Sequence, residues 1–129
     1  MPTDSHAPHE KLRAWQASSG LAAEVYKVSR LWARDERYGL TAQVRSAAYS
    51  VGANIAEGVG REGLRELHRF LSIALGSLAE LGFALRLARD IGILPQEGWE
   101  LLEEMRREAG RLTGALAKAV RRSRASTRH

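Results

Sequence analysis

The chain has 129 residues, of which 44% are hydrophobic but only 6% aromatic, a composition typical of one helical domain built on small aliphatic side chains. It contains no cysteine, which excludes disulfides and thiolate metal sites and makes a cytoplasmic protein the expectation. The net charge of +5 lies in the last twelve residues, because the first 117 residues hold fifteen basic and fifteen acidic side chains.

The first nine residues are polar and include two prolines, so they are expected to form a flexible leader rather than a signal sequence or an anchor. No apolar run approaches the roughly 20 residues that a membrane span needs, so no membrane contact is expected. A first helix is expected from about Glu10 to Ala33, because apolar residues recur there at helical spacing. These residues are Leu21, Val25, Val28 and Trp32.

A second helix is expected from about Leu40 to Glu57, after a break in periodicity that ends at Gly39. Several of its apolar positions are small, and one of them is Gly52. A glycine inside a helix costs about 1 kcal/mol relative to alanine, so Gly52 indicates a close contact with a neighbouring helix.

The third helix is expected from Leu64 to about Gly92, and an apolar residue recurs in it every three or four positions. The members of this repeat are Leu64, Leu67, Leu71, Ala74, Leu78, Leu81, Leu85 and Ala88. A second apolar row widens the face to about half the circumference, more than one core contact requires. Either this helix lies deep between neighbouring helices, or part of its wide face contacts another subunit. Phe83, an aromatic residue on the polar side of the helix, favours the subunit contact. The residues expected to form that contact are Phe70, Ile73, Phe83 and Leu87.

The fourth helix is expected from about Pro95 to residue 120, and its charges change from acidic to basic along its length. Short connections between the four segments predict an all-α, antiparallel up-down-up-down four-helix bundle over residues 10–120. Residues 121–129 then form a basic C-terminal tail. The basic residues of this tail, together with Lys118 just before it, are candidates for binding nucleic-acid phosphates. They are Lys118, Arg121, Arg122, Arg124 and Arg128. The alternative is a helix end whose charge serves only solubility and the helix dipole.

Two further patterns have structural interpretations. Gly58, Gly60 and Gly63 match the spacing of a dinucleotide-binding fingerprint, but no strand precedes them, so a helix-helix turn is favoured. The four histidines do not assemble with carboxylates at metal-binding spacing. No cofactor and no metal are therefore expected.

Six polar residues fall where the helices are otherwise apolar: Gln43, Arg45, Asn54, Glu57, Ser77 and Glu80. They form either a ligand or catalytic pocket, or a structural hydrogen-bond network between helices or subunits. The structural network is favoured, because the sequence shows neither a nucleophile beside a base nor two acids in clearly different environments. We therefore expect a protein that is not an enzyme.

The chain contains the segments ERYGLTAQVR at 36–45, ANIAEG at 53–58 and FLSIALGSLAEL at 70–81, in that order. Over about residues 12 to 116 it resembles the four-helix-bundle proteins of the 23S rRNA intervening-sequence family. The resemblance implies a small bacterial protein that assembles into a ring-shaped homopentamer, in a family most of whose members have no established activity. Distant relatives are accessory proteins of diversity-generating retroelements, in which a basic pentamer binds the reverse transcriptase and nucleic acid.

Two functions follow as hypotheses. The first is a non-enzymatic oligomer that binds structured RNA, or DNA, through the basic tail, with weak specificity and strong salt dependence. The alternative is a protein-interaction scaffold, or an accessory subunit that docks a partner enzyme such as a reverse transcriptase.

Overall fold

The computed structural model describes residues 7–36 and 39–126. Residues 1–6 of the expected leader, Arg37 and Tyr38, and the final residues 127–129 lie outside this part of the chain. The described residues contain no strand, which confirms the all-α class, and they form these elements: η1 (Pro8–Lys11), α1 (Arg13–Ser29), η2 (Arg34–Glu36), α2 (Leu40–Gly60), α3 (Leu64–Asp90) and α4 (Gln96–Ser126).

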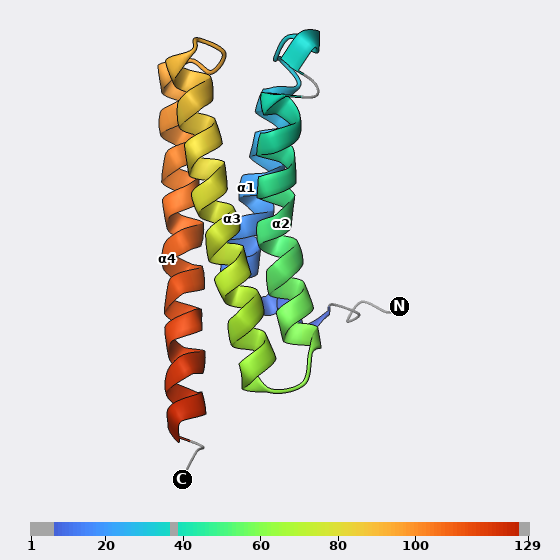
Figure 1. Cartoon of the computed structure of the whole chain (residues 1–129), viewed down its shortest axis with the longest axis vertical. Coiled ribbons are helices and arrows are strands. Elements are labelled where there is room, and N and C mark those ends of the chain that lie inside the picture. The colour runs from blue at the N-terminus through green and yellow to red at the C-terminus, as the bar shows by residue number, and fades with distance from the viewer. Residues whose placement is uncertain (1–6, 37–38, 127–129) are drawn as a thin grey trace.

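The four α-helices lie side by side along one long axis (Figure 1). α1 packs against α2, α2 against α3, α3 against α4 and α4 against α1, so the contacts close around a shared core. The α2–α3 connection and the C-terminus of α4 lie at one end of the bundle, which we call the C-terminal end. The α1–α2 and α3–α4 connections lie at the opposite end (Figure 1).

α3 provides the centre of the core. From Leu71 to Ala88, every member of the predicted apolar repeat is buried. Burial of one such leucine contributes about 1.5–3 kcal/mol, so this helix supplies much of the driving force for folding. The other helices add fully buried side chains to the same core: Leu21, Val25, Val51, Ile55 and Leu102.

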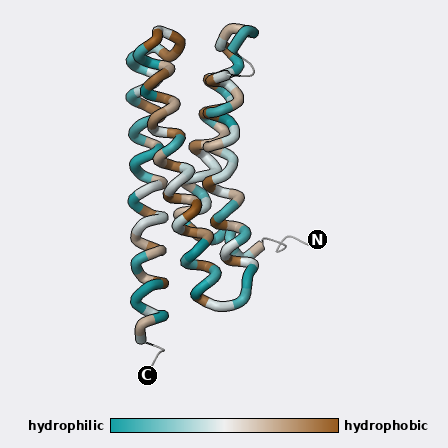
Figure 2. The backbone as a smooth tube through the Cα atoms, viewed as in Figure 1, coloured by the Kyte–Doolittle hydropathy of each residue, from teal (hydrophilic) through white to brown (hydrophobic). Residues whose placement is uncertain are grey.

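A glycine flanks α3 at each end, and the connections that contain these glycines differ in hydropathy. Gly63 and Gly92 flank the helix with φ of 89° and 86°, a backbone conformation that glycine adopts without strain. Figure 2 shows that the α3–α4 connection is hydrophobic, whereas the α2–α3 connection is hydrophilic. In the hydrophobic connection, the N–H groups of Ile93 and Leu94 both donate to the carbonyl oxygen of Ala88, and Leu94 is buried. This connection therefore seals one end of the core.

α2 is longer than expected and approaches α3 closely at one glycine. The helix extends to Gly60, so Gly58 is a buried helical residue rather than part of a turn. A Cβ atom at Gly58 would lie 2.8 Å from the Cβ of Phe70. At Gly52 a Cβ would instead make an ordinary contact, 3.6 Å from Nε1 of Trp15. The close helix contact expected at Gly52 is therefore found at Gly58.

The first and last helices also have boundaries that the periodicity did not indicate. α1 ends at Ser29 rather than near Ala33, and η1 precedes it. α4 continues to Ser126, so residues 121–126 of the basic segment extend the helix. The cations of that segment are therefore carried by a regular helix.

One described helix, α3, is long and apolar enough to meet the length and composition criterion for a membrane span, with a mean hydropathy of 1.5. Every 18-residue window of α3 contains Glu80, so this stretch is not the uninterrupted apolar run that the sequence was found to lack. α3 packs between α2 and α4, and 44% of its apolar window is buried inside the bundle. That packing accounts for the buried part of its apolar content, while Ile73, Phe83 and Leu87 remain exposed in the single chain.

Candidate nucleic-acid and interaction surfaces

α4 segregates its charges along its length. Residues 96–108 include five acids, whereas residues 109–126 include five basic residues and no acid. Val120 is only 6% exposed, so the helix packs on the bundle at least that far. Cations placed along this part of the helix consequently project from an ordered surface.

Three of the predicted phosphate-binding residues form one exposed group, which we call the C-terminal basic surface: Lys118, Arg121 and Arg122. None of the three makes an ion pair with another described residue. Arg124 is partly buried on the same helix, and Arg128 lies outside the described residues. Figure 1 shows this end of α4 reaching past the α2–α3 connection.

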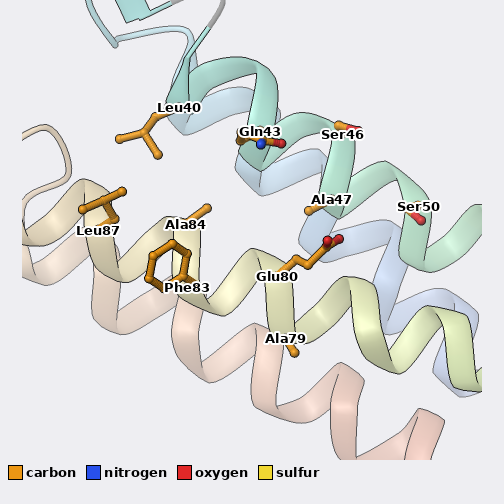
Figure 3. A pocket seen from close by; sticks show the side chains of 10 residues that line it. All are labelled: Leu40, Gln43, Ser46, Ala47, Ser50, Ala79, Glu80, Phe83, Ala84 and Leu87. Atoms are coloured by element: carbon orange, nitrogen blue, oxygen red, sulfur yellow. The ribbon is translucent and has the colours of Figure 1, made fainter.

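An open groove of about 620 Å³ lies between α2 and α3 (Figure 3). Its residues, which define the α2–α3 groove, are Leu40, Gln43, Ser46, Ala47, Ser50, Ala79, Glu80, Phe83, Ala84 and Leu87. Figure 3 shows Leu40 facing Phe83 and Leu87 at one end, with the Glu80 carboxylate extending from α3 toward α2. Neither Glu80 nor Gln43 forms a hydrogen bond or ion pair with another described side chain.

Three of the four residues predicted to contact another subunit remain exposed in the single chain. Phe83 is 71% exposed, and Ile73 and Leu87 are each more than a third exposed. Phe70 differs, because it is 8% exposed and its ring is covered by the guanidinium groups of Arg61 and Arg69. Phe70 therefore belongs to the packing of its own chain.

Two of the six predicted polar-network residues link α2 to α3. The Oγ atoms of Ser50 and Ser77 lie 2.7 Å apart, and Asn54 Nδ2 donates to the Ser50 oxygen over 2.9 Å. Ser77 is buried, so this small network satisfies a hydroxyl inside the helix interface. Ser50, the centre of the network, was missed because a lone serine on a helix carries no periodic signal.

The remaining polar residues do not join that network. Arg45 links α2 to α1, because its Nε donates to the Oγ of Ser29 over 2.7 Å. Glu57 is exposed and pairs within α2 with Arg61 over 2.8 Å, an arrangement that contributes little to stability. The six residues are thus spread over separate contacts, and they do not converge on one pocket.

No catalytic arrangement emerges from these contacts. Among residues 7–36 and 39–126, no group of three or more histidine or acidic side chains could hold a metal ion. The polar groups that meet in these contacts are hydroxyl, amide and guanidinium groups, and the carboxylate of Glu57, which pairs with Arg61.

A second open hollow, of about 640 Å³, lies between α3 and α4 and was not anticipated from the sequence. We call it the arginine hollow after four of its lining residues: Arg86, Arg89, Arg106 and Arg107. The first two come from α3 and the last two from α4. Trp99 and Glu103 line it as well.

The wall of the hollow is built around a nearly buried ion pair. Glu103 is 8% exposed and accepts hydrogen bonds from Arg106, at 2.9 Å from Nε and 2.5 Å from Nη2. This hydrogen bonding lowers the pKa of Glu103 below its ordinary value, and Glu103 in turn raises the pKa of Arg106. Arg106 also donates to the carbonyl oxygen of Leu78. Gly82 makes room for its guanidinium, since a Cβ there would lie 2.8 Å from the Arg106 Cζ.

Two comparisons with known proteins concern the bundle, and the family match ends before Lys118. The family model of the 23S rRNA-intervening sequence protein matches residues 10–115. The fold is similar to the crystal structure of a protein with unknown function from the S23 ribosomal protein family of Bacteroides thetaiotaomicron. That chain is 21% identical, the TM-score is 0.73, and the similarity covers 81% of the present chain and 98% of the other. No curated protein matches the sequence.

Proposed function

The chain belongs to the 23S rRNA-intervening sequence protein family, and from that premise we propose that it is a non-enzymatic protein that binds nucleic acid. The ligand class is structured RNA, or DNA, held by phosphate contacts from the C-terminal basic surface. The observation that carries the proposal is that Lys118, Arg121 and Arg122 are exposed on an ordered helix without acidic partners among the described residues.

The spacing of these cations favours a polyanion as their partner. Lys118 lies three residues before Arg121 and four before Arg122, so its side chain neighbours that of each arginine on the helix surface. Like charges at these spacings repel one another, and phosphates placed across them relieve that repulsion. The same segment contains no acid that could do so within the helix.

Binding of this kind is weakly specific. Phosphate contacts fix the position of a protein on nucleic acid but do not read its sequence. We therefore expect an affinity that falls steeply with salt and varies little among sequences.

Charge-neutral substitution tests the proposal better than truncation does, because shortening the chain before Val120 would remove a buried core residue. The test variant is Lys118→Gln/Arg121→Gln/Arg122→Gln, and the matched control is Lys27→Gln/Arg30→Gln/Arg34→Gln at the opposite end of the bundle. The control residues are also exposed, and the control removes the same charge. Binding to a labelled RNA hairpin is measured by fluorescence anisotropy at low salt.

We expect the test variant to bind more than about tenfold more weakly than the native chain, and the control to stay within about threefold of it. Equal binding by the native chain and the test variant would remove the basic surface from consideration. Equal losses of affinity in the test and control variants would show that binding depends on the net charge of the protein and not on the position of these cations.

Self-assembly is the second element of the proposal. We propose that up-down-up-down subunits join through the α2–α3 groove into a ring-shaped homopentamer, the assembly that the family resemblance implies. The exposed side chains of Ile73, Phe83 and Leu87 support a contact on this face. A ring would also bring five copies of the basic surface together.

The mass of the native chain in solution tests this assembly. We expect light scattering coupled to gel filtration to give a pentamer, and Phe83→Ser/Leu87→Ser to shift the mass toward the monomer. A native chain that stays monomeric at micromolar concentration leaves the groove available to a different protein. That result favours the second candidate function, an accessory subunit that docks a partner enzyme.

A further inference from the structure

We propose that the arginine hollow between α3 and α4 is a second phosphate-binding site, which holds the backbone of the same nucleic-acid strand that the C-terminal basic surface binds. This inference rests on the proposed function and extends it, because it adds a site on another part of the bundle. It is based on four guanidinium groups gathered in one hollow, two of which are not held by the packing.

Two of the four arginines are fixed in structural roles. Arg106 is held by Glu103 and by the carbonyl oxygen of Leu78. Arg89 lies over the ring of Trp99, 4.3 Å from its centroid, and pairs with Asp90 over 2.9 Å. These contacts shape the walls of the hollow and leave little of either guanidinium for a ligand.

The other two arginines are available. The side chains of Arg86 and Arg107 are 70% and 72% exposed. Their ion pairs are long, at 4.0 Å from Arg86 to Asp90 and 3.4 Å from Arg107 to Glu103, and both carboxylates already serve another arginine. Exposed pairs of this kind contribute little, so a phosphate can replace the carboxylate as the partner. A guanidinium group binds phosphate through two parallel hydrogen bonds.

The hollow and the C-terminal basic surface lie on the same side of α4. Arg107 and Lys118 are eleven residues apart, which is about three helical turns, so their directions differ by only about 20°. They are about 16 Å apart along the axis, and Arg121 is about 21 Å from Arg107. The only acid between Arg107 and Ser126 is Glu108, which pairs with Arg111.

The surface is open at the midpoint between the two sites. Gly114 lies seven residues from both Arg107 and Arg121, and no side chain beyond its chain neighbours and no other helix lies within 4 Å of the place where its Cβ would be. A stacked strand with one phosphate per 3.4 Å of rise spans 16–21 Å in about five or six nucleotides, and an extended single strand spans it in fewer. One short strand can therefore reach from the hollow to the basic surface.

Two double variants test the inference. Arg86→Gln/Arg107→Gln neutralises the available arginines of the hollow, and Lys27→Gln/Arg30→Gln is a control with the same charge change. Both are compared with the native chain and with the variant of the C-terminal basic surface. The probes are a labelled RNA oligonucleotide of about 20 nucleotides and a labelled dinucleotide, chosen to be longer and shorter than the span between the sites. All positions changed are exposed, and thermal unfolding of each variant checks that it folds.

On the long probe we expect the hollow variant to bind about five- to tenfold more weakly than the control. Its log–log salt slope should be shallower than that of the native chain by about 1.4, the value for two single-strand phosphate contacts. On the short probe, which cannot reach both sites at once, the difference from the control should largely disappear.

The outcomes separate the inference from the proposed function. If the hollow variant behaves as the control does while the basic-surface variant loses binding, the second site is wrong and the proposed function stands. If neither variant loses binding, both are wrong. If inorganic phosphate binds the hollow at millimolar concentration, but the hollow variant binds the long RNA as tightly as the control does, the site takes a small anion and the inference fails.

Discussion

The close approach of α2 and α3 at Gly58 offers a sharp test of the packing. In Gly58→Ala the new Cβ would lie 2.8 Å from the Cβ of Phe70 and 3.4 Å from the carbonyl oxygen of Leu67. Both atoms are fixed by the α3 backbone, so the helices must separate to admit the methyl group. Gly60→Ala is the matched control, because nothing lies within 4 Å of that position on the same helix.

The two substitutions are expected to change the free energy of unfolding in opposite directions. Alanine is favoured over glycine in a helix by about 0.8–1 kcal/mol, and near a helix end the gain at residue 60 should be about half of that. Overpacking in a core costs about 1–3 kcal/mol, and the rigid neighbours at Gly58 place it in the upper half of that range. We expect Gly58→Ala to lower the free energy of unfolding by about 1–2 kcal/mol and Gly60→Ala to raise it by about 0.5 kcal/mol.

Urea unfolding followed by circular dichroism measures both variants. For a domain of this size, the loss in Gly58→Ala corresponds to a fall in Tm of about 4–8 °C. A Gly58→Ala chain at least as stable as Gly60→Ala would refute the close approach, and with it the account of how α2 packs on α3.

Three other substitutions probe buried polar groups. Thr113→Val should raise the free energy of unfolding by about 1 kcal/mol, because the buried Oγ1 of Thr113 makes no hydrogen bond within the described residues; a loss in a thermal melt would show that the hydroxyl is satisfied. Ser77→Ala should lower it by about 0.5–1 kcal/mol through the lost bond to Ser50, measured against the exposed control Ser46→Ala. Glu103→Gln should lower it by about 1–3 kcal/mol at neutral pH, because Arg106 loses its charged partner. Since the folded pKa of Glu103 is depressed, its contribution is complete above the unfolded value of about 4.3 and is lost as pH falls through the folded pKa. The difference between native and Glu103→Gln should shrink in urea melts taken toward pH 3, and a difference that stays constant would contradict the pair.

Periodicity was sufficient to predict most of the face of α3 that forms the core. The repeat from Leu71 to Ala88 predicted buried residues correctly, because the side-chain direction in a helix follows from sequence spacing alone. The same logic identified Phe83 and Leu87 as residues that one chain leaves exposed.

Contacts between helices could not be predicted in this way, because spacing does not fix the axial register of one helix against another. The sequence favoured Gly52 as the site of a close helix contact and placed Gly58 in a turn, yet Gly58 is the one that lies where α2 crosses close to α3. Similarly, Glu103 and Arg106 are near neighbours in the chain, but the hollow exists because α3 brings Arg86 and Arg89 beside them. The sequence feature that could have indicated the hollow is a glycine on one helix, such as Gly82, that makes room for a long side chain of the neighbouring helix.

The covering of Phe70 has a related cause. Its ring looked free for another subunit, because it belongs to the second apolar row of α3. The α2–α3 connection brings Arg61 against that ring, and Arg69 lies over it from the same helix. The conformation of the connection decides whether Arg61 can stack on this ring, and helix periodicity does not describe that conformation.

The salt dependence of RNA binding by the native chain is the most direct test of the central claim, that phosphate contacts from α4 and from Arg86 of α3 hold nucleic acid. Three contacts from the C-terminal basic surface and two from the arginine hollow predict a log–log slope of about −3.5 per bound chain on single-stranded RNA. In Lys118→Gln/Arg121→Gln/Arg122→Gln the slope should become shallower by about 2. An affinity that does not change with salt, or a slope that is the same in that variant, would contradict the claim.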